Sequence, residues 1–105
     1  MTREYLDAEG TPEQYAATQL ESLEAELKAD GYTVQQEGPV EIQKRPAFQR
    51  IHTFAMGQSE VKLRQWQVYF VKGKLAITIT STDKEASFDK SFPIFQAAVK
   101  EFRFL

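Results

Sequence analysis

The chain has 105 residues, of which 42% are hydrophobic and 27% are charged, and it contains no cysteine. These proportions are typical of a soluble globular domain, and the lack of cysteine excludes disulfides, thiolate catalysis and thiolate metal sites. The formal net charge of -2 gives no broad cationic field, so we expect no nucleic-acid partner. A chain of this length builds one hydrophobic core, and we expect a single domain spanning residues 1–105.

Nothing in the sequence indicates a membrane segment. The chain contains no apolar run long enough to cross a bilayer, and residues 1–10 lack the apolar centre of an export signal. We therefore expect a cytoplasmic protein with no direct membrane insertion.

The first predicted element is a helix that begins near Thr11. The run Thr-Pro-Glu-Gln offers a capping hydroxyl on Thr11, a proline in the first turn, and Gln14 to complete a capping box. Spacings of four, three and four residues then predict one packed stripe, made of Ala16, Leu20, Leu23 and Leu27. Asp30-Gly31 is expected to end this helix, because glycine adopts the left-handed conformation without strain.

Alternating patterns of period two follow Gly31 and predict strands. Residues 32–37 are expected to form a short strand that Gly38-Pro39 interrupts, and residues 40–43 are the candidate segment for resuming it. Because proline removes a ladder donor, we expect short or edge strands here.

Three longer strands are expected to form an antiparallel meander, at residues 47–55, 60–71 and 76–80. The predicted turns are Met56 to Ser59 and Lys72-Gly73. A two-residue turn at Lys72-Gly73 places Phe70 opposite Leu75, which makes one face of the last two strands apolar.

The other face of these strands is predicted to be uncharged and partly polar. It carries Gln65, Gln67 and Tyr69 beside Ala76, Thr78 and Thr80, and it is extended by Ala47, Gln49, Ile51 and Thr53. A slip of one residue at Lys72-Gly73 would exchange the two faces.

A second helix is expected from Ser91 to Phe102, after a polar connection or helical turn at residues 83–90. Ser91 is the expected N-cap, Pro93 lies in the first turn, and Phe102 to Phe104 is a candidate pairing segment. These elements predict an α+β fold: an antiparallel sheet with two helices packed on one face.

No catalytic motif is found, and we expect no enzyme activity, no catalytic residue, no metal site and no cofactor. His52, the only histidine, is expected to be a partly exposed strand residue, because no cleft or carboxylate partner is indicated for it. The uncharged sheet face is the better candidate for function, since Gln, Thr and Tyr can hold a helix of another protein. A missing strand, a dimer partner or nothing at all are alternative covers for this face.

The sequence resembles the DcrB-like branch of the PsbP-like superfamily over nearly its whole length. The matching segments are Thr2-Arg3-Glu4, residues 11–27 with Glu13-Gln14-Tyr15 and Gln19-Leu20, Gly38-Pro39, Arg45-Pro46-Ala47, Arg64-Gln65-Trp66-Gln67, Gly73-Lys74, Ile77-Thr78-Ile79-Thr80 and residues 95–104. Among cytosolic bacterial members, it is similar to the Eag family of type VI secretion chaperones.

The resemblance implies a PsbP-like two-layer sandwich that lacks the N-terminal strands preceding Thr2 in other members. It also implies a non-catalytic chaperone or adaptor that shields apolar helices of a secreted effector. The predicted protein-binding residues are Gln49, Ile51, Gln65, Gln67, Tyr69, Thr78 and Thr80. The alternatives are an accessory or structural subunit like the PsbP and DcrB proteins, or a self-associating homodimer.

Overall fold

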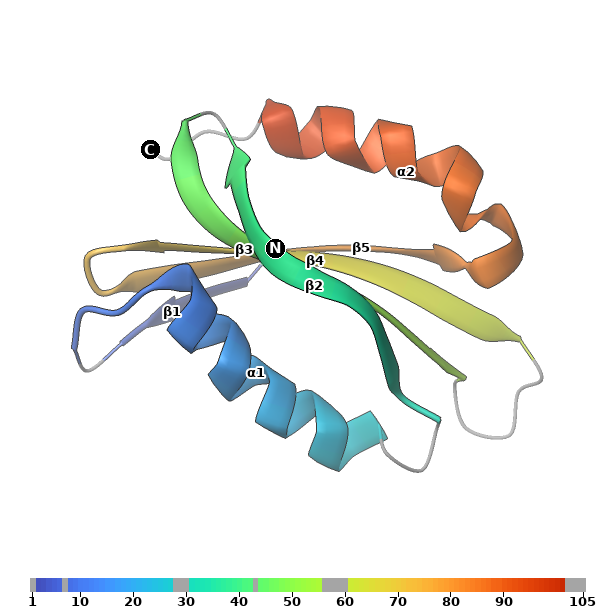
Figure 1. The fold of residues 1–105 in the computed structure, drawn as a ribbon, viewed down its shortest axis with the longest axis horizontal. Helices are drawn as coiled ribbons and strands as arrows, with labels where there is room; N and C mark the ends of the chain where they lie inside the picture. Colours follow the sequence, from blue (N-terminus) through green and yellow to red (C-terminus); the bar gives the residue numbers. More distant parts are fainter. Residues whose placement is uncertain (1, 7, 28–30, 43, 56–60, 102–105) are drawn as a thin grey trace.

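The structure is a computed structural model that describes residues 2–6, 8–27, 31–42, 44–55 and 61–101. Five strands form one antiparallel sheet in the order β1-β5-β4-β3-β2 (Figure 1). The elements are β1 (Thr2–Tyr5), α1 (Pro12–Leu27), β2 (Thr33–Ile42), β3 (Arg45–Ala55), β4 (Lys62–Lys72), β5 (Leu75–Lys84) and α2 (Glu85–Lys100). The predicted α+β class and the meander of β3, β4 and β5 are confirmed.

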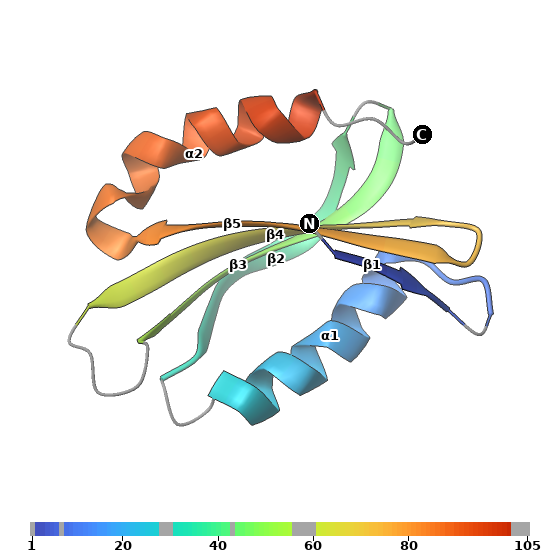
Figure 2. The same ribbon diagram turned by 180° about the vertical axis from the view of Figure 1, so that it is seen from behind.

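The two helices lie on opposite faces of the sheet, so the prediction that both pack on one face is wrong (Figures 1 and 2). The α1-side core consists of Tyr15, Ala16, Phe48, Tyr69 and Ala76. The α2-side core consists of Ala47, Trp66, Val68, Phe70, Ile77, Phe88 and Val99. Large side chains of β4 thus point to both sides, and each side requires a cover. The result has three layers rather than the two of the predicted sandwich.

The strand β1 was not predicted. It pairs antiparallel with the first half of β5, with Thr2 opposite Thr78 and Tyr5 opposite Leu75. Its four side chains are all exposed, so the segment lacks the alternation by which buried strands are found. Thr2–Tyr5, which the resemblance placed after further strands, is itself the edge strand beyond β5.

The turn between β4 and β5 is Gly73-Lys74 rather than Lys72-Gly73. Lys72 pairs with Leu75 and Phe70 pairs with Ile77, a shift of two residues from the predicted register. Gly73 takes the positive φ of 61° that this tight turn requires. Because a shift of two preserves the alternation, the predicted faces of β4 and β5 are correct.

The helix α1 begins as the sequence predicts. The Gln14 backbone N–H donates to Thr11 Oγ1 at 3.1 Å, and the Thr11 N–H donates to Gln14 Oε1 at 3.0 Å, which completes the capping box. The described helix ends at Leu27, and Gly31 has the expected left-handed φ of 71°. Residues 28–30, including Asp30 of the predicted end, lie outside the described residues.

The edge strand β2 runs through Gly38 and Pro39 without the predicted interruption. Pro39 pairs with Phe48, and as an edge residue it does not interrupt the ladder. An irregularity between Val34 and Gln36 is the one register shift in this pairing.

The helix α2 begins at Glu85, six residues before the predicted start, and includes Pro93. Ser91 is therefore inside the helix, where its hydroxyl donates to Asp83 Oδ2 instead of capping. Neither described helix is long and apolar enough to cross a membrane. The predicted turn at Met56 to Ser59 and the pairing segment at Phe102 to Phe104 lie outside the described residues.

Candidate protein-binding face

The face of the sheet that α1 covers, called here the α1-side face, is built from transverse rows of side chains. Direct pairing across β3, β4 and β5 aligns Phe48 with Tyr69 and Thr78, Arg50 with Gln67 and Thr80, and His52 with Gln65 and Thr82. Residues opposite one another share a face. The last two rows contain the four residues that we call the glutamine–threonine ladder: Gln65, Gln67, Thr80 and Thr82.

The ladder is held by hydrogen bonds between side chains. Gln65 Nε2 donates to Thr82 Oγ1 at 2.9 Å, and Gln67 Nε2 donates to Thr80 Oγ1 at 3.4 Å. The glutamines are partly exposed and both threonines are exposed. The ladder is therefore an uncharged surface with hydrogen-bonding capacity.

Tyr69 closes one end of the ladder. Its hydroxyl donates to Gln67 Oε1, and burial raises the pKa of Tyr69 to about 12, against the lowering effect of Arg50. The phenol consequently keeps its proton at neutral pH. The Tyr69 ring is 0% exposed and meets Tyr15 of α1 edge-on, with ring centroids 6.0 Å apart.

Arg50 fastens α1 to the sheet. Its side chain is 2% exposed; Nε donates to Glu37 Oε2 at 2.9 Å, and Nη1 donates to the Ala16 carbonyl at 3.1 Å and to Tyr69 Oη at 3.2 Å. Each contact belongs to a different element, namely β2, α1 and β4. A buried guanidinium needs such partners to offset the loss of hydration.

His52 is 0% exposed, so the prediction of a partly exposed strand histidine is wrong. Its Nε2 lies 2.6 Å from Gln65 Oε1 and its Nδ1 lies 3.3 Å from the Tyr32 hydroxyl. Because Gln65 Nε2 already donates to Thr82, Gln65 Oε1 is assigned as acceptor and His52 Nε2 as donor. Burial lowers the pKa of His52, the Gln65 hydrogen bond opposes this, and Arg50 lowers it further. The imidazole is therefore neutral, and its partners are an amide and a phenol.

The structure divides the seven predicted binding residues between the two faces. Gln65, Gln67, Tyr69, Thr78 and Thr80 lie on the α1-side face, as predicted. Gln49 and Ile51 lie on the α2 side, where Gln49 Oε1 accepts from Trp66 Nε1 at 3.1 Å and Ile51 packs against the α2-side core. The assignment of these two residues to one face with the others is wrong. Nothing in the sequence set the alternation of β3 relative to β4, and it is Arg50 that faces Gln67.

Tyr69 and Thr78 are not accessible on the α1-side face. Thr78 is 5% exposed beneath α1, and its Oγ1 donates to the Tyr15 hydroxyl at 3.4 Å. The Tyr15 hydroxyl in turn donates to Glu4 Oε2 at 3.1 Å. Of the predicted residues on this face, Gln65, Gln67 and Thr80 remain open to a partner.

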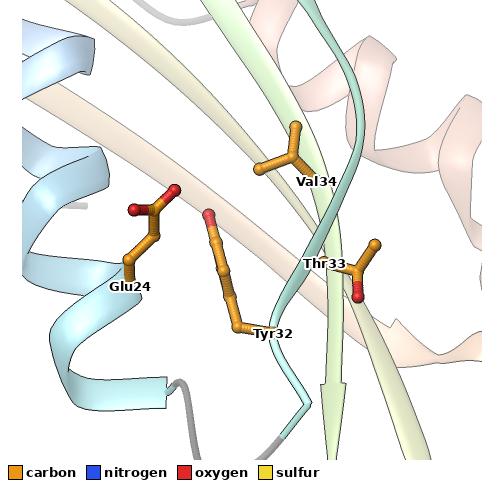
Figure 3. A pocket seen from close by; sticks show the side chains of 4 residues that line it. All are labelled: Glu24, Tyr32, Thr33 and Val34. Carbon is orange, nitrogen blue, oxygen red and sulfur yellow. The ribbon is translucent and has the colours of Figure 1, made fainter.

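A cavity of about 480 Å³ lies between the C-terminal half of α1 and the start of β2 (Figure 3). Its described lining residues are Glu24, Tyr32, Thr33 and Val34. The Tyr32 ring packs on His52 with centroids 4.8 Å apart, so the cavity connects to the ladder through Tyr32, His52 and Gln65. Sequence reasoning missed this cavity, because nothing in the pattern indicated that Glu24 and Tyr32 meet.

Burial raises the pKa of Tyr32 to about 12; Arg50 opposes this effect, and the negative charges of Glu24 and Glu37 add to it. The phenol therefore stays protonated and can donate to His52 Nδ1. Within the described residues, no three histidine or carboxylate side chains are grouped as metal ligands would be.

No protein-family model matches the chain, and no curated protein matches it significantly in sequence. Among solved structures it is similar to PA94 of Pseudomonas aeruginosa, described as a protein of unknown function and a candidate regulator. The TM-score is 0.73 at 19% sequence identity, over 99% of this chain and 82% of the other. This similarity shows the α+β fold.

Proposed function

We propose that this protein is a cytoplasmic, non-catalytic adaptor that binds and shields apolar helices of a secreted effector, as Eag chaperones of type VI secretion do. The observation that carries the proposal is the partly exposed glutamine–threonine ladder on the α1-side face. When an apolar helix is removed from water, the few polar side chains that it carries lose their hydrogen bonds to solvent. The glutamine amides and threonine hydroxyls of the ladder can replace those hydrogen bonds. A charged surface in this place would instead impose a desolvation cost.

The helix α1 provides the apolar wall that such a groove needs. Arg50 holds α1 at Ala16, a residue that is fully buried, whereas Leu20 and Leu23 further along the helix are only partly buried. The C-terminal end of α1 lies beside the start of β2 (Figure 2). A partner helix placed between this wall and the ladder would bury both leucines, and burial of apolar area is the main favourable term in such binding.

Photo-crosslinking in the native cells tests the position of the partner. A photoreactive amino acid replaces Thr80, an exposed ladder residue, and in a matched control it replaces Thr18, an exposed residue of α1 outside the buried face. We expect Thr80 to crosslink to an apolar helical segment of a large secreted protein, and Thr18 not to do so. Equal crosslinking from both positions, or none from Thr80, would contradict the proposal.

Charge substitution tests the same face by affinity. Thr80→Glu places a carboxylate on the ladder and is expected to weaken partner binding at least tenfold, because a buried unpaired charge is costly. Thr18→Glu adds the same charge to the outer side of α1 and is expected to change binding less than twofold.

Crosslinking of Thr80 to a second copy of this chain would instead support a self-associating homodimer.

A further inference from the structure

The cavity beside the ladder is lined by one carboxylate, one phenol and one aliphatic wall from two different elements. Glu24 reaches into it from α1, and Tyr32 reaches into it from the segment before β2 (Figure 3). In Figure 3 the two side chains extend in the same direction with their polar ends next to one another, and Val34 lies beyond them. The Tyr32 hydroxyl donates its hydrogen bond to His52 Nδ1. Its oxygen lone pairs can therefore accept a hydrogen bond from a ligand in the cavity.

The elements that form the cavity are negatively charged. The helix α1 and the strand β2 contain no lysine and no arginine, and they carry Glu13, Glu21, Glu24, Glu26, Glu37 and Glu41. The positive charge of Arg50 acts on Tyr32, but it is paired with Glu37 at 2.9 Å. Within the part of the chain that the structure describes, Glu24 has no ion-pair partner.

This combination matches a cation on an aliphatic stem. A carboxylate pairs with ammonium or guanidinium, an aromatic face attracts the same charge, and an aliphatic wall packs against the methylene groups that precede it. A volume of about 480 Å³ has room for such a side chain. The negative charge of Glu24 would repel an anionic group, and a purely apolar group would give this carboxylate no charge partner.

We propose that this cavity binds a lysine or arginine side chain of the partner polypeptide, next to the apolar segment that lies on the ladder. The inference deepens the proposed function and rests on it for the identity of the partner. The hydrogen-bonded path from Tyr32 through His52 to Gln65 joins the cavity to the ladder, so one polypeptide reaches both. The partner is thus an apolar helix with a basic residue at one end.

Side-chain analogues test the cavity without any partner. The full-length protein is titrated with n-butylammonium and methylguanidinium at low salt, with n-butanol as the neutral analogue, while backbone amide signals are followed by NMR. We expect saturable shifts of Thr33 and Val34 with the two cations, which decrease as salt is added. Shifts of equal size with n-butanol, or no saturable shift at all, would overturn the proposal.

Matched glutamate variants separate the cavity from the general negative charge of α1. Glu24→Gln is expected to weaken cation binding at least fivefold, whereas Glu26→Gln, an exposed residue of the same helix outside the cavity lining, should change it less than twofold. Equal losses from both variants would show a diffuse charge effect and overturn the site. Because the analogues contain no apolar helix, failure of the crosslinking experiment leaves this result independent.

Lys28 lies four residues after Glu24 in the sequence, at the spacing of helical ion pairs, and outside the described residues. The variant Lys28→Gln tests whether this chain supplies its own cation. Equal or moderately tighter analogue binding by the variant supports a cation from the partner. Binding that is absent in the natural protein and arises only in Lys28→Gln would contradict it.

Discussion

His52 makes the stability of the fold depend on pH below about 6.5. Burial lowers its pKa in the folded protein below the value of about 6.5 for an exposed histidine. Below pH 6.5, His52 therefore binds a proton in the unfolded chain but stays neutral in the folded chain. The free energy of unfolding consequently decreases as the pH falls toward the pKa of His52 in the folded protein. Above pH 6.5, His52 is mainly neutral in both states, so no stability is lost through this residue. Below pH 6.5 the free energy of unfolding decreases by at most about 1.4 kcal/mol per pH unit.

The test compares the natural protein with His52→Gln in urea unfolding at pH 7.5, 6.5 and 5.5. No other histidine is present, so the difference between the two pH profiles isolates this residue. We expect the natural protein to lose free energy of unfolding more steeply than the variant between pH 6.5 and 5.5. Parallel profiles would mean that His52 titrates normally in the folded state.

At this scale the sequence predicts local chemistry better than burial. The capping residues Thr11 and Gln14 were predictable because both partners lie within one turn. The burial of Arg50 and His52 was not predictable, because the segments that cover them, α1 and Tyr32, lie far away in the sequence. These same segments supply hydrogen-bond partners to both residues. A charged or ionisable strand residue gives no sign by itself that a helix will cover it.

Two exposed threonines of α1 allow the start of the helix to be tested against its interior. Thr11→Ala removes the hydroxyl that accepts from the Gln14 N–H, and it should cost about 1 kcal/mol. Thr18→Ala replaces an exposed residue inside the helix by a better helix former, and it should stabilise by about 0.5 kcal/mol. Urea unfolding measures both, and changes of the same sign would disprove the assigned start.

Element boundaries were predicted well only where the chain carries a strong signal. The start of α1 and the two faces of β4 and β5 follow from capping and from alternation. The early start of α2 was missed because residues 85–90 mix charged and apolar side chains, although Phe88 is one of its buried contacts with the sheet. The edge strand β1 was missed because its exposed side chains carry no pattern; its pairing with β5 is what makes it a strand.

The placement of the two helices depends on the sheet, which carries large side chains on both of its faces. Predicting two helices did not by itself indicate which face each helix covers. Both faces of β4 carry large side chains, Tyr69 on one and Phe70 on the other, so a cover on one side leaves the other face in water. Two helices and two faces require one helix for each. The same alternation explains why Gln49 and Ile51 lie on the α2 side of the sheet. Arg50, which stands between them in the strand, points to the α1 side, and consecutive residues of a strand point to opposite faces.

Opposite helices predict that the two cores respond independently to mutation. Tyr15→Phe removes hydrogen bonds to Glu4 and Thr78 on the α1 side and should cost about 1 kcal/mol. Phe88→Leu repacks the α2 side, where Phe88 contacts the Phe92 and Phe95 rings, and should cost about 1.5 kcal/mol. The sheet separates the two sites, and among the described residues they share no hydrogen-bond or ring partner. The effect of the double variant should therefore equal the sum of the two single effects within about 0.5 kcal/mol. A coupling energy above about 1 kcal/mol in urea unfolding would place both helices in one shared core.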